Sequence, residues 1–364
     1  MMNVVIRTDA SALIGTGHLV RCLTLADNLR AADAGVTFVC REHRGHLCEL
    51  LKSRGYPVIR LPAPEQVDLS AETDDDYAAW LAVSWQRDAD QTAAAIRSLG
   101  SIPDWLVVDH YGLDGKWESH LRALVRQIMV TDDLAGRVHD CDILLDQNAH
   151  IDQDMRYDKL VPATCRRLLG PTYALLRPEF HIARSLRRQK DRARRLLIFF
   201  GGVDKANLAG QVLEVLTQLS GRDFSIDLIA GWSNPHREKL RKSCCSVSSA
   251  TFYSHVENMA EMMFQAGLAL GAAGTTTWER CAVGLPAVVV AAAENQVAIG
   301  EAVNRLGVGR YLGRASQVSF QMMVEESMSL LNDQDRLTAM RQAGLDLVDG
   351  LGCQRVCSIM ADTI

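Results

Sequence analysis

The sequence predicts an α/β protein of two similar halves, each built on a mostly parallel sheet covered by helices. Short runs rich in β-branched residues alternate with longer segments of helical period, which is the rhythm of strand–helix units. This rhythm is interrupted by a stretch with three prolines and a basic run, and then restarts. A length of 364 residues leaves room for two domains of ordinary size.

Six strands are predicted in the first half, each from a short β-branched run. They are Asn3–Thr8, Val36–Cys40, Pro57–Leu61, Trp105–Asp109, Ile128–Asp132 and Ile143–Asp146. Helical period covers His18–Ala32, Tyr77–Leu99 and Lys116–Arg126. Strands separated by helices form parallel sheets, so the first half is predicted to be Rossmann-like.

The second half restarts at Leu196–Phe200 after the basic run Arg184–Arg195, which predicts an N-terminal domain over residues 1–185 and a C-terminal domain over 186–364. The basic run reads as a solvated helix face, with a phosphate-contacting patch as the alternative. Further strands are predicted at Ser225–Ala230, Thr251–Tyr253, Leu268–Leu270 and Ala287–Val290. Helices are predicted at Leu208–Leu219, Asn258–Gln265, Thr276–Ala282 and Gln296–Leu306, and from Ser316 onward.

The charge balance and the apolar content limit the classes of partner. The 39 basic and 44 acidic side chains give a net charge of −5, so we expect a small-molecule partner and neither nucleic acid nor a membrane. The ten cysteines lie in apolar stretches and the first residues read as a strand, which favours a reducing, cytoplasmic setting. The most apolar window, residues 285–293, has about half the length of a membrane span. The oligomeric state stays unknown.

The turn after the first strand is the first candidate site. Gly15 and Gly17 permit positive φ and close approach of a substrate, and His18 falls at the start of the following helix. Amides that point outward there keep an imidazole neutral, so His18 can accept a proton, and Arg21 shares its face of the helix. A glycine turn with a capping histidine is the structural alternative. Val20 occupies the place of the third glycine of a dinucleotide fingerprint, which argues against a dehydrogenase.

Polar clusters follow other predicted strands. Asp109-His110-Tyr111 and Asp132-Asp133 lie at strand ends where a sugar site needs donors and acceptors, although each could equally be a cap or turn. In the second half, glycine turns at residues 199–207 and 270–281 suit a phosphate bound by free backbone amides. Glu279 could hold a ribose diol or close a capping box with Thr276.

We predict no metal site and no cofactor. Cys40, His43, His46 and Cys48 match no common zinc spacing, and the two cysteines fit the core of a strand and of a helix.

Seven of these segments occur in one order across most of the chain. They are residues 9–22, 107–111, 131–137, 141–148, 170–180, 200–207 and 271–286. Together they resemble the PseG family, the UDP-2,4-diacetamido-2,4,6-trideoxy-β-L-altropyranose hydrolases of pseudaminic acid biosynthesis, a pathway of flagellin glycosylation. The blocks G-T-G-H-x-x-R-C and G-A-A-G-T-T-T-W-E are specific because they lie in different halves with the expected spacing. The segment Gln66–Leu99 is less diagnostic, and Ala273 replaces a glycine of many relatives.

The resemblance implies a GT-B-like fold related to the MurG-type glycosyltransferases, with two Rossmann-like domains facing a cleft. It implies that the C-terminal domain binds UDP and that the sugar turns toward the N-terminal domain. Carried over residue by residue, His18 is the catalytic base and Glu279 is a ribose ligand. The other positions carried over are Tyr111 and Asn295, expected in the sugar pocket, and Asn207, Gly274 and Thr275, expected near the diphosphate.

The activity that follows is metal-independent hydrolysis of the UDP-sugar at the anomeric carbon. His18 would take a proton from a water that attacks opposite the departing UDP, with inversion. Two alternatives stay open: a GT-B glycosyltransferase with a UDP-sugar donor, and a non-catalytic nucleotide-sugar-binding protein. A lipid acceptor would favour a membrane-docking stretch that the N-terminal half does not show.

Overall fold

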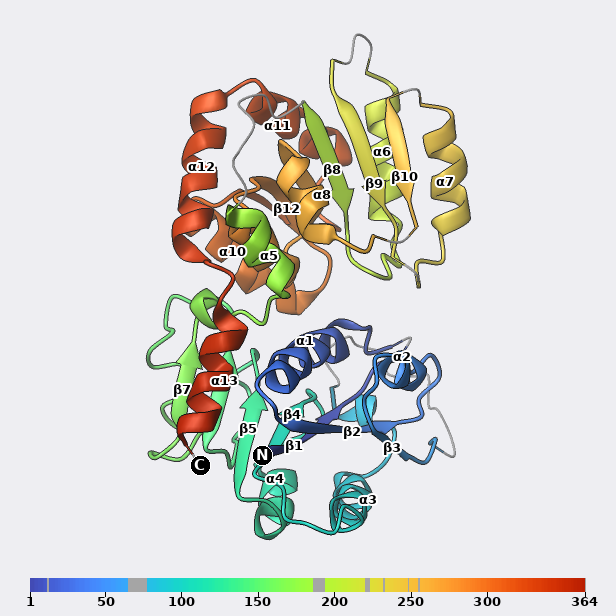
Figure 1. Ribbon diagram of the computed structural model, residues 1–364. Coiled ribbons are helices and arrows are strands. Elements are labelled where there is room, and N and C mark those ends of the chain that lie inside the picture. The colour runs from blue at the N-terminus through green and yellow to red at the C-terminus, as the bar shows by residue number, and fades with distance from the viewer. Residues whose placement is uncertain are drawn as a thin grey trace. The chain divides into compact units, whose positions relative to one another are not determined.

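The computed structural model describes residues 1–11, 13–64, 77–185, 194–219, 223–231, 233–247, 249–254 and 256–363. It divides into two compact units, Met1–Leu175 with Gly352–Ile364, and Leu176–Leu351 (Figure 1). Within the described residues, no helix combines the length and the apolar character needed to cross a membrane.

The first unit contains a parallel sheet whose seven described strands run in the order β3-β2-β1-β4-β5-β6-β7. The chain leaves β1 toward β2 and β3 and then returns to the other side of β1 with β4. Ligands of such sheets bind at the carboxyl ends of the two strands where the order reverses, here β1 and β4. The strands are β1 (Asn3–Thr8), β2 (Gly35–Arg41), β3 (Val58–Leu61), β4 (Trp105–Asp109), β5 (Gln127–Thr131), β6 (Ile143–Asp146) and β7 (Arg166–Leu169).

All six predicted strands of this half are confirmed within one residue at each end, and β7 was missed. Arg166 and Arg167 are exposed on this edge strand, so it lacks the apolar run that marks the others. The helix predicted over Tyr77–Leu99 was wrong as one element. Ala82 has a φ of 54° and Ser84 caps a new helix, which divides the segment into η1 and α3. Residues 66–76 of the Gln66–Leu99 segment lie outside the described residues.

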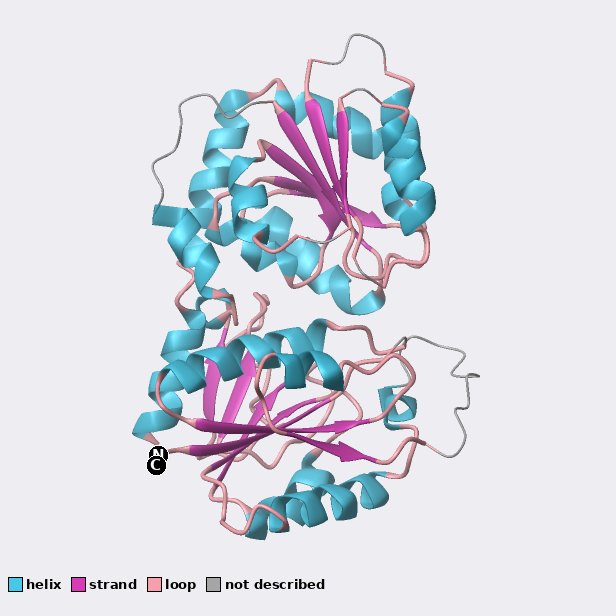
Figure 2. Ribbon diagram, turned by 45° about the vertical axis from the view of Figure 1, so that its right-hand side comes forward, coloured by secondary structure: helices cyan, strands magenta, loops and turns pink. Residues whose placement is uncertain are grey.

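The helices of the first unit cover both faces of its sheet (Figure 2). They are α1 (Gly17–Ala31), α2 (Cys48–Ser53), η1 (Tyr77–Leu81), α3 (Trp85–Arg97), α4 (Gly115–Leu121), η2 (Arg122–Leu124), η3 (Pro171–Tyr173) and α13 (Gly352–Asp362).

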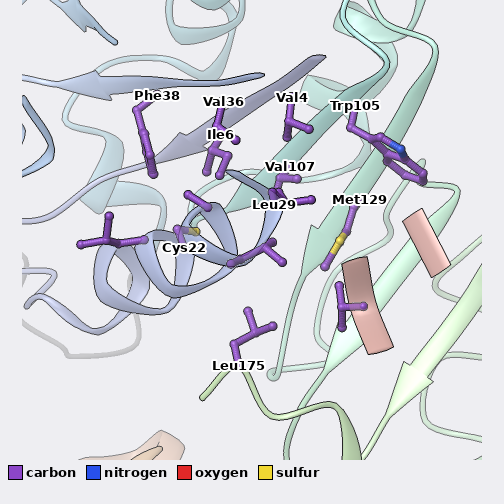
Figure 3. Close-up of a cluster of buried hydrophobic side chains, with 14 of the residues drawn as sticks. Val4, Ile6, Cys22, Leu29, Val36, Phe38, Trp105, Val107, Met129 and Leu175 are labelled. Atoms are coloured by element: carbon purple, nitrogen blue, oxygen red, sulfur yellow. The ribbon is translucent and has the colours of Figure 1, made fainter. Parts of the chain in front are cut away.

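Helix α1 packs its apolar stripe onto the sheet (Figure 3). Cys22 and Leu29 of α1 belong to one buried cluster with Val4, Ile6 and Val107 of the sheet. Burying such side chains contributes roughly 1.5–3 kcal/mol each, so this cluster fixes where α1 begins. This packing therefore positions the first turn of α1, which contains His18, next to the carboxyl end of β4.

The second unit repeats the architecture with six described strands in the order β10-β9-β8-β11-β12-β13, all parallel. Its order reverses between β8 and β11. The strands are β8 (Arg195–Phe199), β9 (Ser225–Ile229), β10 (Ala250–Tyr253), β11 (Leu268–Ala272), β12 (Ala287–Ala291) and β13 (Arg310–Arg314). The helices are α5 (Pro178–Ser185), α6 (Leu208–Thr217), α7 (Arg237–Cys245), α8 (Met259–Gln265), α9 (Thr276–Ala282), η4 (Glu294–Gln296), α10 (Val297–Arg305), α11 (Phe320–Leu331) and α12 (Gln334–Leu347).

The division of the chain differs from the predicted domains 1–185 and 186–364 at two places. Helix α5 belongs to the second unit, where Arg184 Nη1 donates to the carbonyl of Leu345 at 2.6 Å. Helix α13 belongs to the first unit, where Trp105 Nε1 donates to the carbonyl of Met360 at 3.2 Å. Residues 186–193 of the basic run lie outside the described residues.

Candidate active site

The loop that carries His18 follows β1 at the reversal point of the first sheet. Gly15 has a φ of 81°, as predicted, and its amide donates to the Ser11 carbonyl at 2.9 Å, which closes the loop. Gly17 does not adopt the positive φ that its lack of a side chain permits, because it is the first residue of α1. A Cβ on Gly17 would meet no described atom within 4 Å, so the surface in front of the His18 backbone is open.

His18, Arg21 and Asp109 form a buried cluster between α1 and the end of β4. His18 Nδ1 lies 2.6 Å from Asp109 Oδ1. Arg21 binds both carboxylate oxygens of Asp109, with Nε donating to Oδ2 at 2.6 Å and Nη2 to Oδ1 at 2.7 Å. The carboxylate is fully buried and the His18 side chain is 10% exposed. Helix α1 thus brings together the two polar residues that the sequence placed on one face.

The charges of this cluster fix the state of Asp109 and the orientation of His18. Burial alone would raise the pKa of the Asp109 carboxyl, but Arg21 and His18 outweigh it and hold that pKa below its usual range. The ionised carboxylate of Asp109 accepts a hydrogen bond from the N–H group at Nδ1 of His18, so the nitrogen of the neutral ring that can take a proton is Nε2. A carboxylate that holds the tautomer of a histidine in this way is the arrangement of a general base.

Tyr111 closes one side of the histidine. Its ring meets the His18 ring edge-on, with centroids 4.5 Å apart, and its hydroxyl donates to Asp133. Asp133 is shared with Arg21, whose Nη1 donates to it at 3.2 Å. Trp80 of η1 stacks on Tyr111 with centroids 5.4 Å apart. Sequence analysis did not single out Trp80, because it lies in a segment predicted as helix, where an aromatic residue carries no local signal of a site.

A second buried network lies under the loop. Asp9 Oδ1 accepts from the backbone amide of Arg41 at 2.7 Å and lies 2.7 Å from Arg7 Nη1. His110 turns toward Asp9 Oδ2, which lies 3.5 Å from its Nε2, and its Nδ1 accepts from the Gly112 amide. His110 therefore supports the loop from below instead of lining the site with its neighbour in sequence, Tyr111.

The run of cysteines and histidines that begins in β2 places its two cysteines in the hydrophobic core. Cys40 and Cys48 are buried, and His43 points to Asp9 Oδ2 at 3.4 Å. The part of the chain that the structure describes contains no group of three or more side chains suited to hold a metal ion.

The start of α9 lies at the reversal point of the second sheet. Thr275 precedes the helix and makes no side-chain cap hydrogen bond. The hydroxyl of Thr276 instead accepts from Arg280 Nη1 at 3.2 Å. The predicted capping box of Thr276 and Glu279 is therefore not formed, and the structural alternative for Glu279 was wrong.

Glu279 is half-buried on α9, and no residue of the described ranges donates a hydrogen bond to its carboxylate. Burial raises the pKa of Glu279 above its usual value, partly offset by Arg177 and Arg280. A carboxylate in this state gains from a donor supplied from outside the chain.

Asn295 is an exposed residue of η4, at the carboxyl end of β12. The neighbouring Gln296 accepts from the Ala292 amide at 2.9 Å through Oε1. Its Nε2 lies 3.6 Å from the position that a Cβ on Gly274 would take. The turn with Asn295 therefore lies beside the Gly274 loop, although the two segments are separate in sequence.

The turn after β8 differs from the expectation of free amides. Asp204 accepts from the amides of Leu208 and Ala209 at 2.8 and 3.1 Å, so its carboxylate already occupies the start of α6. Asn207 adopts a left-handed conformation with a φ of 54°, and its buried Oδ1 has no hydrogen-bond partner among the described residues. Phosphate binding by free amides of Leu208 and Ala209 is therefore excluded in this state.

The chain was compared with known families and proteins. Residues 196–329 match the model of the glycosyltransferase family 28 C-terminal domain. The UDP-2,4-diacetamido-2,4,6-trideoxy-beta-L-altropyranose hydrolase of Campylobacter jejuni is 27% identical over 72% of this chain and 81% of its own length. The resemblance drawn from the motifs is confirmed.

Two further relatives match this chain over only part of their own length. The spore coat polysaccharide biosynthesis protein SpsG of Bacillus subtilis is 27% identical over 57% of this chain and 62% of its own length. An uncharacterised protein of Methanocaldococcus jannaschii is 25% identical over 79% of this chain, and the match spans 55% of that protein. The chain thus spans about half to two thirds of the length of these two relatives.

Solved structures share the fold at low sequence identity. Acinetobacter baumannii MurG has a TM-score of 0.68 at 17% identity, with both chains fully covered. A putative UDP-N-acetylglucosamine 2-epimerase from Listeria monocytogenes has a TM-score of 0.64 at 13% identity, over 100% of this chain and 96% of the other. Together with the two parallel sheets, these neighbours confirm the predicted two-domain α/β fold of GT-B type.

Proposed function

We propose that the chain is an enzyme that hydrolyses UDP-2,4-diacetamido-2,4,6-trideoxy-β-L-altropyranose at the anomeric carbon. The observation that carries the proposal is the pair of His18 and Asp109, 2.6 Å apart at the reversal point of the first sheet. The similarity to the hydrolase of Campylobacter jejuni supports the choice of substrate.

In the proposed reaction, Nε2 of His18 takes a proton from a water molecule while the water oxygen bonds to C1 of the sugar. The bond from C1 to the phosphate oxygen breaks, and its electron pair leaves with UDP. The buried carboxylate of Asp109 stabilises the imidazolium that forms, and solvent then removes the proton. Attack opposite the leaving group inverts the anomeric centre.

We assign the sugar and the base to the first unit and UDP to the second. Tyr111 contacts the His18 ring and is assigned to the sugar with Gly15, Gly17 and Arg21 of the same loop and helix. Glu279 is assigned to the ribose diol because no residue that the structure describes donates a hydrogen bond to its carboxylate. The remaining assignments are Gly274, Thr275 and Asn207 to the diphosphate and Asn295 to the sugar.

A glycosyltransferase is the second candidate. The match to the glycosyltransferase family 28 C-terminal domain favours it, because that match covers most of the unit assigned to UDP. A unit that binds the UDP-sugar serves hydrolysis and glycosyl transfer equally well. This match therefore does not show whether the sugar passes to water or to a sugar acceptor. The basic nitrogen of His18 can take a proton from water or from an acceptor hydroxyl, so the preference for the hydrolase rests on the similarity to the hydrolase of Campylobacter jejuni.

The test is release of UDP from the purified full chain with the UDP-sugar and no acceptor. A hydrolase releases UDP at once, and we expect the His18→Asn variant to lose about 10²-fold or more in kcat with a smaller change in affinity. The matched control is His120→Asn, since His120 is 42% exposed and pairs with the surface residue Asp90. UDP release that depends on an added acceptor would instead establish a transferase, and tight binding without any release a binding protein.

A further inference from the structure

Arg280 of α9 has a buried guanidinium whose contacts all lie at the end of β11 and the start of α9. The residue is 3% exposed. Its Nη2 donates to the Ala272 carbonyl at 3.2 Å and to Thr277 Oγ1 at 2.9 Å. Its Nη1 donates to Thr276 Oγ1 at 3.2 Å. The positive charge therefore sits directly behind the loop of residues 272–277.

The charge of Arg280 is unbalanced, unlike that of the other buried arginines. Arg7, Arg21 and Arg41 each have a carboxylate oxygen within 2.7 Å. Within the described ranges, no carboxylate forms an ion pair with Arg280, and the neighbouring Glu279 interacts with it only at longer range. Burial lowers the pKa of Arg280 to about 10, which reflects the same lack of compensation.

A buried charge without a partner is unfavourable, and a bound anion removes that penalty. The hydrogen bonds of Arg280 also direct the two threonine hydroxyls. Each hydroxyl oxygen accepts from the guanidinium, so the proton of each hydroxyl must point away from Arg280. Thr276 is half-buried, and its polarised hydroxyl is available as a donor on the open side of the loop.

We propose that Arg280 is the fixed counter-charge for an anionic group bound at the loop of residues 272–277, and that it acts on this group through Thr276. The inference rests on the proposed function, under which the anion is the diphosphate of UDP. Arg280 is a positioning residue in this reading, because its guanidinium is buried behind the loop. It holds the loop and offsets the charge that UDP carries when it leaves.

The test compares UDP with uridine, which lacks the phosphates, as ligands of the full chain. We expect Arg280→Met to weaken UDP binding about 10- to 100-fold in calorimetry and to leave uridine binding, followed by ligand-observed NMR, unchanged. Arg280→Lys keeps the charge and should recover part of the UDP affinity. Thr276→Val keeps the shape of the side chain but removes the hydroxyl, and it should weaken UDP alone.

The matched control is Arg195→Met in the same unit. Arg195 pairs with Asp227 at 3.0 Å at the amino end of β8, whereas α9 follows the carboxyl end of β11, so the loss of Arg195 should leave both affinities unchanged. If Arg280→Met does not fold, Arg280→Lys and Thr276→Val decide the question. Wild-type affinity for UDP in all Arg280 and Thr276 variants would overturn the inference and leave the proposed function intact. A wild-type chain that binds no UDP would instead refute the proposed function itself.

Discussion

Under the proposed function, Asp109 has two tasks. It orients His18 for catalysis and it neutralises Arg21 inside the protein. Both tasks depend on the ionised state of this buried carboxylate. The amide of asparagine would keep the shape and remove the charge, so Asp109→Asn tests both tasks at once.

The first prediction concerns the pH dependence of stability. Burial would raise the pKa of Asp109, but Arg21 and His18 hold it below the unfolded value. The contribution to stability is therefore complete above the ordinary aspartate range, begins to decline as the pH enters that range, and is lost only when the pH falls through the lower pKa of the folded chain. Asp109→Asn should lower the free energy of unfolding at pH 7 by about 3–5 kcal/mol, because the buried Arg21 loses both of its close bonds to a carboxylate and keeps only the longer one to Asp133 at 3.2 Å. The difference in the free energy of unfolding between wild type and Asp109→Asn should narrow toward pH 3, as measured by denaturant titrations.

The control for this prediction is Asp90→Asn, since Asp90 is 72% exposed and should cost little at either pH. A difference between Asp109→Asn and wild type that stays constant from pH 7 to pH 3 would contradict the assigned charge state. In the acceptor-free assay, Asp109→Asn should also lower kcat more than it changes KM.

The second prediction concerns Glu279. Burial raises its pKa in the folded chain, so the ionised carboxylate lowers stability once the pH rises through that value. Glu279→Gln should therefore leave the Tm unchanged or raise it, while UDP binding weakens by about 1.5–3 kcal/mol for the lost charge-assisted bonds. Thermal unfolding checks the expected Tm, and calorimetry with UDP checks the expected loss of affinity. A lower Tm with unchanged affinity for UDP would mean that Glu279 serves the helix alone.

At the scale of elements, the turns that follow the first strand and Leu268–Leu270 could be predicted, whereas the order of the strands and the contacts between them could not. The run Trp105–Asp109 and the G-T-G-H turn are visible in the sequence, and their strands become neighbours in the sheet. The 2.6 Å pairing of His18 with Asp109 depends on the register of β1 against β4 and on the packing of α1. Neither is encoded by a local pattern, so Asp109 appeared only as a member of a polar cluster.

The third prediction concerns the docking of α13 on the first unit. A Cβ on Gly352 would lie 2.2 Å from the carbonyl oxygen of Ala174, so even alanine forces the helix away from its position. Gly352→Ala should destabilise the chain by about 1–3 kcal/mol, as overpacking does in other cores. Thermal unfolding measures this loss. Gly136→Ala is the matched control, because an added Cβ there meets no described atom within 4 Å and the residue is exposed. Equal Tm values for the two variants would show that α13 adapts without cost.

At the scale of the whole molecule, the sequence was sufficient for two parallel sheets but not for the path of the chain between them. Helix α13 returns to the first unit through contacts with residues such as Trp105, which are 255 positions away in sequence. A terminal helix with an apolar stripe packs equally well on either sheet by its pattern alone, so the assignment to residues 186–364 followed from position and was wrong.

The last prediction concerns which bond the full chain breaks. In ¹⁸O-labelled water, we expect the label in the free sugar and none in UDP, with inversion at C1. His18 is oriented by Asp109. Under the proposed function it takes the proton of a water, so the nucleophile is produced where the sugar is assigned. The counter-charge proposed for Arg280 stabilises the negative charge of departing UDP and so favours cleavage of the bond from C1 to the phosphate oxygen. Mass spectrometry of both products measures the label, and UDP incubated with the chain in labelled water serves as the control. Label in the β-phosphate of UDP would mean cleavage of the bond between phosphorus and oxygen, and His18 would then have no role toward the anomeric carbon.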